Sequence, residues 1–422
     1  MEHFFTADIL LPKRGTDLTR FSVVACDQYT SEPKYWERVR NKTEREVSAY
    51  HLIFPEAELK TADFTKKIEQ INRTMEEYLD GGVFASYPDS MFYVERTLRN
   101  GAVRRGLIGR VDLEEYDYQK GSQSLIRATE GTVLERIPPR VKIREHAPLE
   151  LPHVMLLVDD PAKSVIEPLQ PQAEQWEQVY DFSLMEDSGR LKGWRLPEQA
   201  VKQVAVALAA LVDPKAFSGR YQVEDCPSLL FAVGDGNHSL ATAKACYEAL
   251  KETLGGEAAR RHPARYALVE LVNLHDTSLE FEAIHRVVFG VDPDHLLQEM
   301  KKALSVTEEA VLDGQSFVMV RGERKECLNV PDPDSNLAVG TLQNFLDQYT
   351  KTFGGETDYI HGEAVVESLC RERQDVVGFL LPCMEKSELF RTVILDGALP
   401  RKTFSMGEAC DKRFYLEARK IR

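Results

Sequence analysis

The sequence predicts an α/β fold with α+β character, in which mixed sheets carry flanking helices. Three observations support this class. Short apolar runs typical of buried strands alternate with longer segments of helical periodicity. The dipeptide Asn100-Gly101 lies between two alternating stretches and predicts an antiparallel hairpin. An apolar run from Leu229 to Val233 leads through two glycines into a helical segment, so strand–turn–helix units are also expected.

Helices are expected where apolar residues recur at helical spacing. The clearest such segment, residues 61–80, is followed by Gly81-Gly82, which is typical of a helix C-terminus. Near the start of the chain, Ser31 offers an N-cap and Pro33 lies in a first helical turn. The expected helices span residues 33–50, 61–80, 197–212, 240–250, 296–304 and 337–349.

Strands are expected at short apolar or alternating runs bounded by turn residues. The segment 359–363 is expected to connect two helices. The expected strands span residues 21–25, 91–98, 103–111, 154–158, 176–184, 229–233, 265–272, 281–289, 317–320 and 376–381, with a return strand beginning at 327–328. A chain of 422 residues can form one large core or several smaller ones. We expect an N-terminal α/β region (1–150), a central region (151–292) and a C-terminal α/β region (293–422).

Composition limits the classes of function. The net charge of −15 argues against a nucleic-acid-binding surface, because phosphate backbones require a basic footprint. The seven cysteines are scattered without a C-x-x-C pair, which indicates reduced thiols rather than a disulfide framework or a zinc knuckle. No basic and apolar leader and no apolar run near the ~18 residues of a membrane span are found, so a cytoplasmic protein without membrane contact is expected.

The turn after the 229–233 strand carries the strongest functional signal. It combines two glycines, a carboxylate and three further polar side chains at the start of a helix: Gly234, Asp235, Gly236, Asn237, His238 and Ser239. A helix start exposes amide N–H groups, and glycines let an anion approach the backbone, so the turn suits a phosphate. The alternative is a plain turn with Ser239 or Asn237 as N-cap. Neither the G-x-G-x-x-G fingerprint nor a P-loop is present.

Several stretches resemble domain-of-unknown-function family 1015. The Asp235-to-Ser239 segment resembles its Asp-Gly-His-His-Arg signature. The other matching stretches are Val24–Ser31, Ile126–Thr132, Tyr266–Asn273, Ile284–Val287, Tyr359–Glu363 and Leu399–Gly407. The resemblance therefore runs nearly end to end, and it implies that the tail around Pro400–Met406 docks near the site.

The same turn also resembles the phosphate-binding turn of the ParB/sulfiredoxin superfamily. That group includes nucleotide-dependent free-serine kinases, ATP-using sulfiredoxins and CTP-binding ParB proteins. The chain departs from the superfamily at Ser239, where an arginine often follows the histidine. A guanidinium could hold phosphate oxygens, so in this chain the missing charge must come from elsewhere or from a metal ion.

Further candidate ligands and proton acceptors lie outside the turn. Arg127 could clamp an anion and Glu130 could act as acid or base; the alternative is a loop with a solvated ion pair. A basic segment with Arg136, Arg140, Lys142 and Arg144 could supply the clamp or be a solvated face. Family resemblance favours a phosphate-ligand role for His285 and Arg286 over a satisfied core histidine beside a surface arginine. His361 and Glu363 could form an acid–base pair, with His361 also a candidate nucleotide ligand; the alternative is a simple helix cap. Arg401 and Lys402 lie in the tail that resembles the family's closing motif and could clamp a phosphate; the alternative is a loose terminus.

These parts fit three kinds of chemistry. Phosphoryl transfer needs an anion cradle, a cation and a carboxylate. Asp235, Glu130 or Glu363 could provide the carboxylate. His238 is a further catalytic candidate. Metal-assisted hydrolysis by Asp235 and His238 with other histidines lacks a recognisable ligand pattern, and no metal ligand is assigned. The third alternative is a non-catalytic sensor of nucleotides or metabolites.

We therefore expect a small-molecule kinase that uses ATP or ADP with Mg²⁺. The superfamily resemblance implies a small hydroxylated acceptor, with free L-serine the first to test. Whether the chain is an enzyme stays open against the sensor alternative, and so does a homodimer. The partners expected are a nucleotide and a small-molecule substrate, without nucleic acid.

Overall fold

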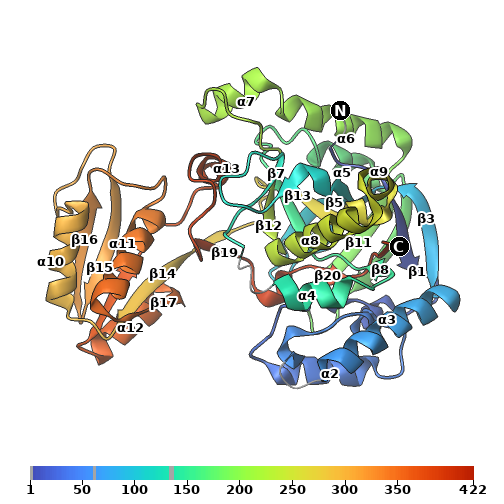
Figure 1. The fold of residues 1–422 in the computed structure, drawn as a ribbon, viewed down its shortest axis with the longest axis horizontal. Coiled ribbons are helices and arrows are strands. Elements are labelled where there is room, and N and C mark those ends of the chain that lie inside the picture. Colours follow the sequence, from blue (N-terminus) through green and yellow to red (C-terminus); the bar gives the residue numbers. More distant parts are fainter. Residues whose placement is uncertain (1–2, 60–62, 133–136) are drawn as a thin grey trace. The chain divides into compact units, whose positions relative to one another are not determined.

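The computed structural model describes residues 3–59, 63–132 and 137–422. The chain divides into two compact units, shown in Figure 1. Unit 1 comprises Met1–Leu279 and Gly407–Arg422, and unit 2 comprises Glu280–Met406. Unit 2 is thus an insertion in the sequence of unit 1. This division differs from the three expected regions because strands before and after residue 150 pair within one sheet.

Within the described part of unit 1, the main sheet is mixed and has nine strands. The hairpin strands β4 and β5 pair antiparallel, whereas β9 runs parallel to β13, and β7 runs parallel to β12. In spatial order the strands are β10 (Glu177–Ser183), β11 (Arg190–Arg195), β4 (Phe92–Thr97), β5 (Val103–Asp112), β13 (Tyr266–Asn273), β9 (Met155–Val158), β12 (Phe231–Asp235), β7 (Ile126–Ala128) and β6 (Tyr116–Asp117). The mixed α/β class predicted from the sequence is confirmed.

Helices cover both faces of this sheet. Because side chains alternate along a strand, Leu107 packs into a core shared with α6 and α8, whereas Ile108 packs into a core shared with α2. The helices of unit 1 are α1 (Leu18–Phe21), α2 (Pro33–Thr43), α3 (Phe64–Asp80), α4 (Ile137–Arg144), α5 (Gln170–Ala173), α6 (Glu198–Leu211), α7 (Pro214–Tyr221), α8 (Asn237–Leu254) and α9 (Gly256–Arg261). Helix α8 begins directly after β12, at the edge of the sheet where that strand ends.

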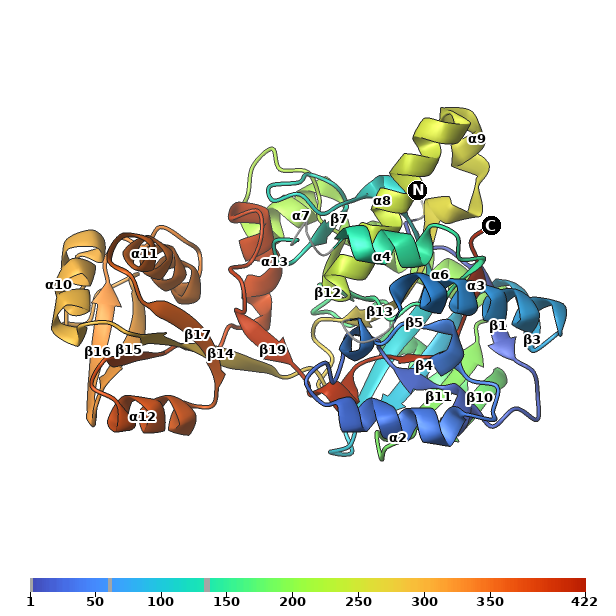
Figure 2. The ribbon, with the colours of Figure 1, turned by 60° about the horizontal axis from the view of Figure 1, so that its bottom comes forward.

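The C-terminal segment, Gly407–Arg422, is built into unit 1. It forms short antiparallel pairs with strands from the first half of the chain. Figure 2 marks the C-terminal end of the chain among the elements of unit 1. These pairs are β2 (Val23–Val24) with β20 (Phe414–Tyr415) and β8 (Leu149–Glu150) with β21 (Arg419–Lys420). A separate pair joins β1 (Ala7–Pro12) to β3 (Phe84–Ser90). Leu416, Ala418 and Ile421 of the C-terminal segment are buried in the apolar cores of unit 1.

Unit 2 is an antiparallel sheet with helices. Its strands follow the order β16 (Arg324–Val330), β15 (Gln315–Arg321), β18 (Val376–Leu380), β14 (Phe281–Phe289) and β17 (Glu356–His361), and β19 (Phe404–Met406) also pairs with β14. Its helices are α10 (Pro293–Leu304), α11 (Ala338–Phe353), α12 (Glu363–Glu372) and α13 (Lys386–Leu395). Val366 and Cys370 of α12 pack against Val287 and Val376 in a small apolar core.

Most elements predicted from the sequence are present, and several differ. The strand expected at residues 21–25 is reduced to β2 (Val23–Val24), because Phe21 ends helix α1. Glu32, rather than Ser31, is the N-cap residue of α2. Helix α2 ends at Thr43 rather than near residue 50, because the hydroxyl of Ser48 accepts the amide of Tyr50 and begins a separate short helix. Tyr359–His361 lies in strand β17 rather than in a connection. Helix α8 begins at Asn237, three residues before the expected start. Across the described ranges, none of the helices combines the length and the apolar character needed to cross a membrane.

Candidate functional site

The turn between β12 and α8 has the backbone geometry of a helix start that can accept an anion. Gly236 joins the two elements with φ of +81°, a left-handed conformation that favours glycine. An added β-carbon would also lie 3.0 Å from the Cα of Val154. The carbonyl of Gly236 accepts the amides of Ser239 and Leu240, both at 3.0 Å. The amides of Asn237 and His238 therefore precede the first hydrogen bond within the helix.

Gly234, by contrast, serves packing within the sheet. A β-carbon at this position would lie 2.7 Å from Cγ of Leu157 on the neighbouring strand β9. The register between β12 and β9 also shifts between Val233 and Asp235. Close approach of two strands therefore accounts for this glycine, and its role in binding a phosphate stays a prediction.

Asp235 connects the turn to the C-terminal segment. Its Oδ1 accepts the amide of Gly236 at 3.0 Å, and its Oδ2 lies 3.3 Å from Nζ of Lys412. The two side chains are 18% and 19% exposed, so this ion pair reaches the surface of unit 1. Lys412 was not among the residues singled out in the sequence.

His153 links three polar groups beside the same turn. Its Nε2 lies 3.0 Å from Oγ of Ser239 and 3.9 Å from Oδ2 of Asp27, and its Nδ1 lies 2.7 Å from the hydroxyl of Tyr415. Burial raises the pKa of Asp27, but His153, the amide of Gln28 and Lys412 together lower it below its usual value. Asp27 is therefore an ionised carboxylate close to the first turn of α8.

The ends of two parallel strands bring more polar groups to this edge of the sheet. Strands β7 and β12 are parallel, so Thr129 and Glu130 follow β7 where Asp235 ends β12. The hydroxyl of Thr129 donates to the carbonyl of Val233 at 2.6 Å. The Nδ2 of Asn237 lies 3.4 Å from the same hydroxyl, and its buried Oδ1 has no hydrogen-bond partner among the described residues.

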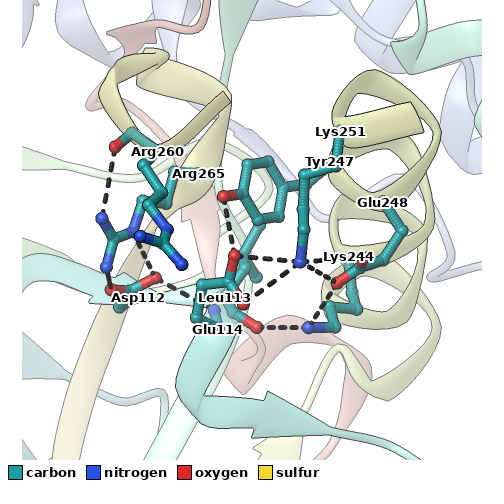
Figure 3. A network of polar contacts seen from close by, with 9 residues as sticks. All are labelled: Asp112, Leu113, Glu114, Lys244, Tyr247, Glu248, Lys251, Arg260 and Arg265. Atoms are coloured by element: carbon teal, nitrogen blue, oxygen red, sulfur yellow. Dashed lines mark hydrogen bonds and ion pairs between the residues drawn. The ribbon is translucent and has the colours of Figure 1, made fainter. Parts of the chain in front are cut away.

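A polar network holds the body of α8 in place (Figure 3). Nζ of Lys244 donates to the carbonyl of Leu113 at 2.9 Å, and the hydroxyl of Tyr247 donates to Glu114 at 2.9 Å. Lys251 forms an ion pair with Glu114 at 3.0 Å. These contacts fasten α8 to the segment after β5, so its first turn is carried by a fixed helix.

The side chain of Arg127 is buried and donates to backbone carbonyls. It is 3% exposed, and it donates to the carbonyls of Ser124 and Pro227, both at 2.8 Å. Burial lowers its pKa. These contacts join two loops, and the anion-clamp role of Arg127 stays a prediction.

The basic segment before and within α4 also contacts carboxylates away from the turn. Arg140 pairs with Glu56, and Arg144 lies 2.5 Å from Glu150. Arg136 lies outside the described residues. The clamp role of this segment therefore stays a prediction.

The other candidates from the sequence belong to unit 2. Nδ1 of His285 accepts the amide of Leu381 at 3.1 Å, and Ile284 pairs with His361 across β14 and β17. Arg401 forms an ion pair with Asp347. His361, Glu363 and Lys402 are exposed. Because these residues lie in a separate compact unit, the candidate site is built from unit 1, and their ligand or acid–base roles stay predictions.

Arg286 is the most buried of the unit 2 candidates. It is 0% exposed and donates to Gln343 at 2.9 Å, to the carbonyl of Ile284 at 2.6 Å and to the carbonyl of Arg401 at 2.9 Å. Its guanidinium also lies 4.7 Å from the ring centre of Tyr359. Burial lowers its pKa to about 10. These contacts give Arg286 an internal structural role.

The side chains near the turn between β12 and α8 determine whether a metal ion could bind there. Among the described residues, no group of three or more His, Cys, Asp or Glu side chains is arranged to hold one. Mg²⁺ commonly binds through one or two carboxylates together with substrate phosphates. The carboxylates of Asp27 and Asp235 satisfy that smaller requirement, so a magnesium ion carried by a nucleotide is compatible with this edge of the sheet.

Sequence reasoning missed three residues of this edge: His153, Lys412 and Tyr415. Asp27 lies within the stretch Val24–Ser31 that resembles the family. His153 precedes a buried strand and Lys412 follows the family's closing motif, but neither position has a periodicity or spacing that identifies it. The signal that could have pointed to Lys412 is the expected docking of the tail near the site.

Three comparisons place the chain among known proteins. A family model described as "Protein of unknown function (DUF1015)" matches residues 10–349. No curated protein matches. Among solved structures, the chain is similar at 12% identity to a free serine kinase in complex with AMP, with a TM-score of 0.37, over 74% of this chain and 91% of that chain.

Two further solved structures are similar at the same 12% identity. SbnI with a C-terminal truncation, from Staphylococcus aureus, matches with a TM-score of 0.35 over 71% of this chain and 82% of that chain. A conserved hypothetical protein from Pyrococcus furiosus matches with a TM-score of 0.35 over 74% of this chain and 94% of that chain.

Proposed function

We propose that this chain, which belongs to the DUF1015 family, is a nucleotide-dependent phosphotransferase acting on a small hydroxylated metabolite. The nucleotide is ATP or ADP with Mg²⁺, and free L-serine is the first acceptor to test. The observation that carries the proposal is the helix start at Gly236, where amides of the first turn of α8 lie beside the carboxylates of Asp235 and Asp27.

In this proposal, the phosphate end of the nucleotide binds at the first turn of α8. The amides of Asn237 and His238 come before the first hydrogen bond of the helix, and the helix dipole adds positive potential there. The left-handed conformation of Gly236 turns the chain sharply into the helix. Asn237, whose Oδ1 is buried without a hydrogen-bond partner among the described residues, can reach a bound hydroxyl or water.

The acceptor hydroxyl requires a carboxylate that accepts its proton. Phosphoryl transfer depends mainly on positioning and electrostatics, with one such group near the nucleophile. Asp27 is a candidate because its carboxylate lies 3.9 Å from His153, which contacts Ser239 in the first turn of α8. Asp235 is held by an amide and a lysine, and Glu130 follows the neighbouring strand, so these two are the competing assignments.

Magnesium would be bound by the nucleotide phosphates with Asp27 or Asp235. In that position it would neutralise part of the phosphate charge. The residues of this chain would then orient the nucleotide along the first turn of α8 and hold the acceptor near a carboxylate.

The direct test is turnover with purified protein. Acceptor-dependent loss of ATP or ADP over a panel of small alcohols and amino acids supports a kinase. We expect His238→Ala to weaken nucleotide binding, whereas His146→Ala, at a 70% exposed side chain, should leave it unchanged. Wild-type affinity in His238→Ala would remove this turn from the proposal.

A second function is favoured by one observation. Ser239 contacts His153 and carries no charge, so position 239 does not supply a guanidinium that could stabilise a transferring phosphate. A sensor that binds a nucleotide or small metabolite without converting it has no need of that charge. Saturable nucleotide binding without turnover across the whole panel would support the sensor and reject the kinase.

A further inference from the structure

The C-terminal segment brings a positive charge to the turn. Lys412 lies 177 positions after Asp235 in the sequence, yet its Nζ is 3.3 Å from the Oδ2 of that residue. Lys412 also contributes to keeping Asp27 ionised. The lysine therefore interacts with both carboxylates whose contacts define the site.

We propose that Lys412 binds the phosphate group of the nucleotide at this turn. Its ammonium supplies the positive charge that Ser239 does not. This assignment rests on the proposed function, because it concerns the same site. A lysine ammonium is a compact charge on a flexible stem and binds phosphate as a point charge. It can therefore leave Asp235 for an incoming phosphate oxygen without a change in the backbone.

Electrostatics favour such a cation. Asp27, Asp235 and Glu130 bring negative charge to the edge where the phosphates are proposed to bind. Like charges at close range repel strongly in a partly buried site. An ammonium between the carboxylates and the phosphate reduces that repulsion, and the helix amides alone carry only partial charges.

The backbone around Lys412 is fixed from both sides. Nη2 of Arg96 donates to the carbonyl of Cys410 at 2.8 Å, and Nη1 of Arg104 donates to the carbonyl of Asp411 at 3.0 Å. The carbonyl of Arg413 accepts the amide of Ala25 at 3.0 Å. Arg96 and Arg104 are 3% and 4% exposed, so the lysine extends from a buried, rigid frame. We assign these two arginines as positioning residues.

The alternative is that Lys412 merely fastens the C-terminal segment to the turn. The two explanations predict different effects on ligand affinity and on the unfolding midpoint when a neutral side chain of similar length replaces Lys412. If the lysine binds phosphate, Lys412→Met weakens binding in proportion to the phosphates on the ligand and leaves the unfolding midpoint nearly unchanged. If the lysine is a fastener, the same variant lowers the midpoint and affects every ligand alike.

The experiment is calorimetric titration of the full-length chain with ADP, AMP and adenosine, each with magnesium. For Lys412→Met we expect ADP affinity to fall about tenfold or more, as for a lost charge-assisted hydrogen bond. The loss should be smaller for AMP and absent for adenosine, and Lys412→Arg should retain most of the ADP affinity. Lys67→Met is the matched control, because Lys67 of α3 is 23% exposed, close to the 19% of Lys412, and also lies in an ion pair, 4.0 Å from Glu58.

Two results overturn the assignment and separate it from the proposed function. ADP affinity in Lys412→Met within twofold of wild type, while wild type binds ADP, rejects the role of Lys412 and leaves the nucleotide site standing. Equal losses for ADP and adenosine in Lys412→Met reject it also. Absence of nucleotide binding by wild type rejects the proposed function and this assignment with it.

Discussion

Arg413 in unit 1 and Arg286 in unit 2 are both buried arginines, but their partners differ. Arg413 lies 2.7 Å from Glu270 and also pairs with Glu417. Arg286 donates to Gln343 and to two backbone carbonyls. Burial lowers the pKa of both side chains, but the carboxylates raise that of Arg413 above its usual value, while that of Arg286 falls to about 10.

The difference shows how each unit uses a buried charge. In unit 1 the ion pairs of Arg413 hold the C-terminal segment that carries Lys412, so the buried charges form part of the frame of the site. In unit 2 Arg286 joins β14, α11 and the segment at Arg401 by hydrogen bonds. A buried arginine without a carboxylate contact depends on geometry more than on charge.

The largest expected effect is at Glu270. This carboxylate lies 2.7 Å from Arg413 and 3.6 Å from Arg104, so Glu270→Gln leaves two buried guanidinium groups without their shared counter-charge. We expect the free energy of unfolding to fall by about 3–5 kcal/mol, measured by denaturant titration. Glu257→Gln, in an exposed ion pair with Arg261, should cost less than about 1 kcal/mol. A similarly small loss at Glu270 would contradict the comparison.

A smaller effect is expected at Arg286. Arg286→Met keeps an apolar stem but leaves Gln343 and two carbonyls without their donor. We expect about 1–3 kcal/mol of destabilisation, confined to unit 2 and visible as faster amide hydrogen exchange in β14 and β17. Loss of nucleotide affinity with unchanged exchange would instead restore the ligand role predicted from the sequence.

Gly236→Ala tests the turn itself. The left-handed φ and the 3.0 Å approach to Val154 should together cost about 1–2 kcal/mol and displace the first amides of α8. The control is Gly219→Ala in α7, where a β-carbon meets nothing within 4 Å. Thermal unfolding and ADP titration of both variants measure the effect. Unchanged ADP affinity in Gly236→Ala would exclude this turn as the phosphate site.

The smallest effect concerns pH. Burial lowers the pKa of His285, and Arg286 and His361 lower it further, whereas Glu363 opposes them. The unfolded chain therefore binds a proton near pH 6.5 before the folded one does. Unit 2 should keep its stability above that pH and lose part of it as the pH falls below. His285→Asn should flatten this dependence in amide-exchange measurements, and an unchanged slope would show that His285 is not its source.

Local patterns predicted much of the fold. The hairpin of β4 and β5 and the helix α6 were predicted within a few residues, because turn chemistry and apolar spacing are local properties. The turn at Gly236 was predicted for the same reason. His153 and Lys412 were not, because they reach the turn through contacts between segments far apart in the sequence. The sequence around His285 and Arg286 likewise cannot reveal that Arg286 donates hydrogen bonds to Gln343 and to two backbone carbonyls.

Amide hydrogen exchange in the first turn of α8 tests the central claim most directly. With ADP and magnesium, the amides from Asn237 to Leu240 should exchange more slowly than in the free protein, and the effect should be lost in Gly236→Ala. Protection elsewhere in the chain with unchanged exchange from Asn237 to Leu240 would contradict a phosphate site at this turn.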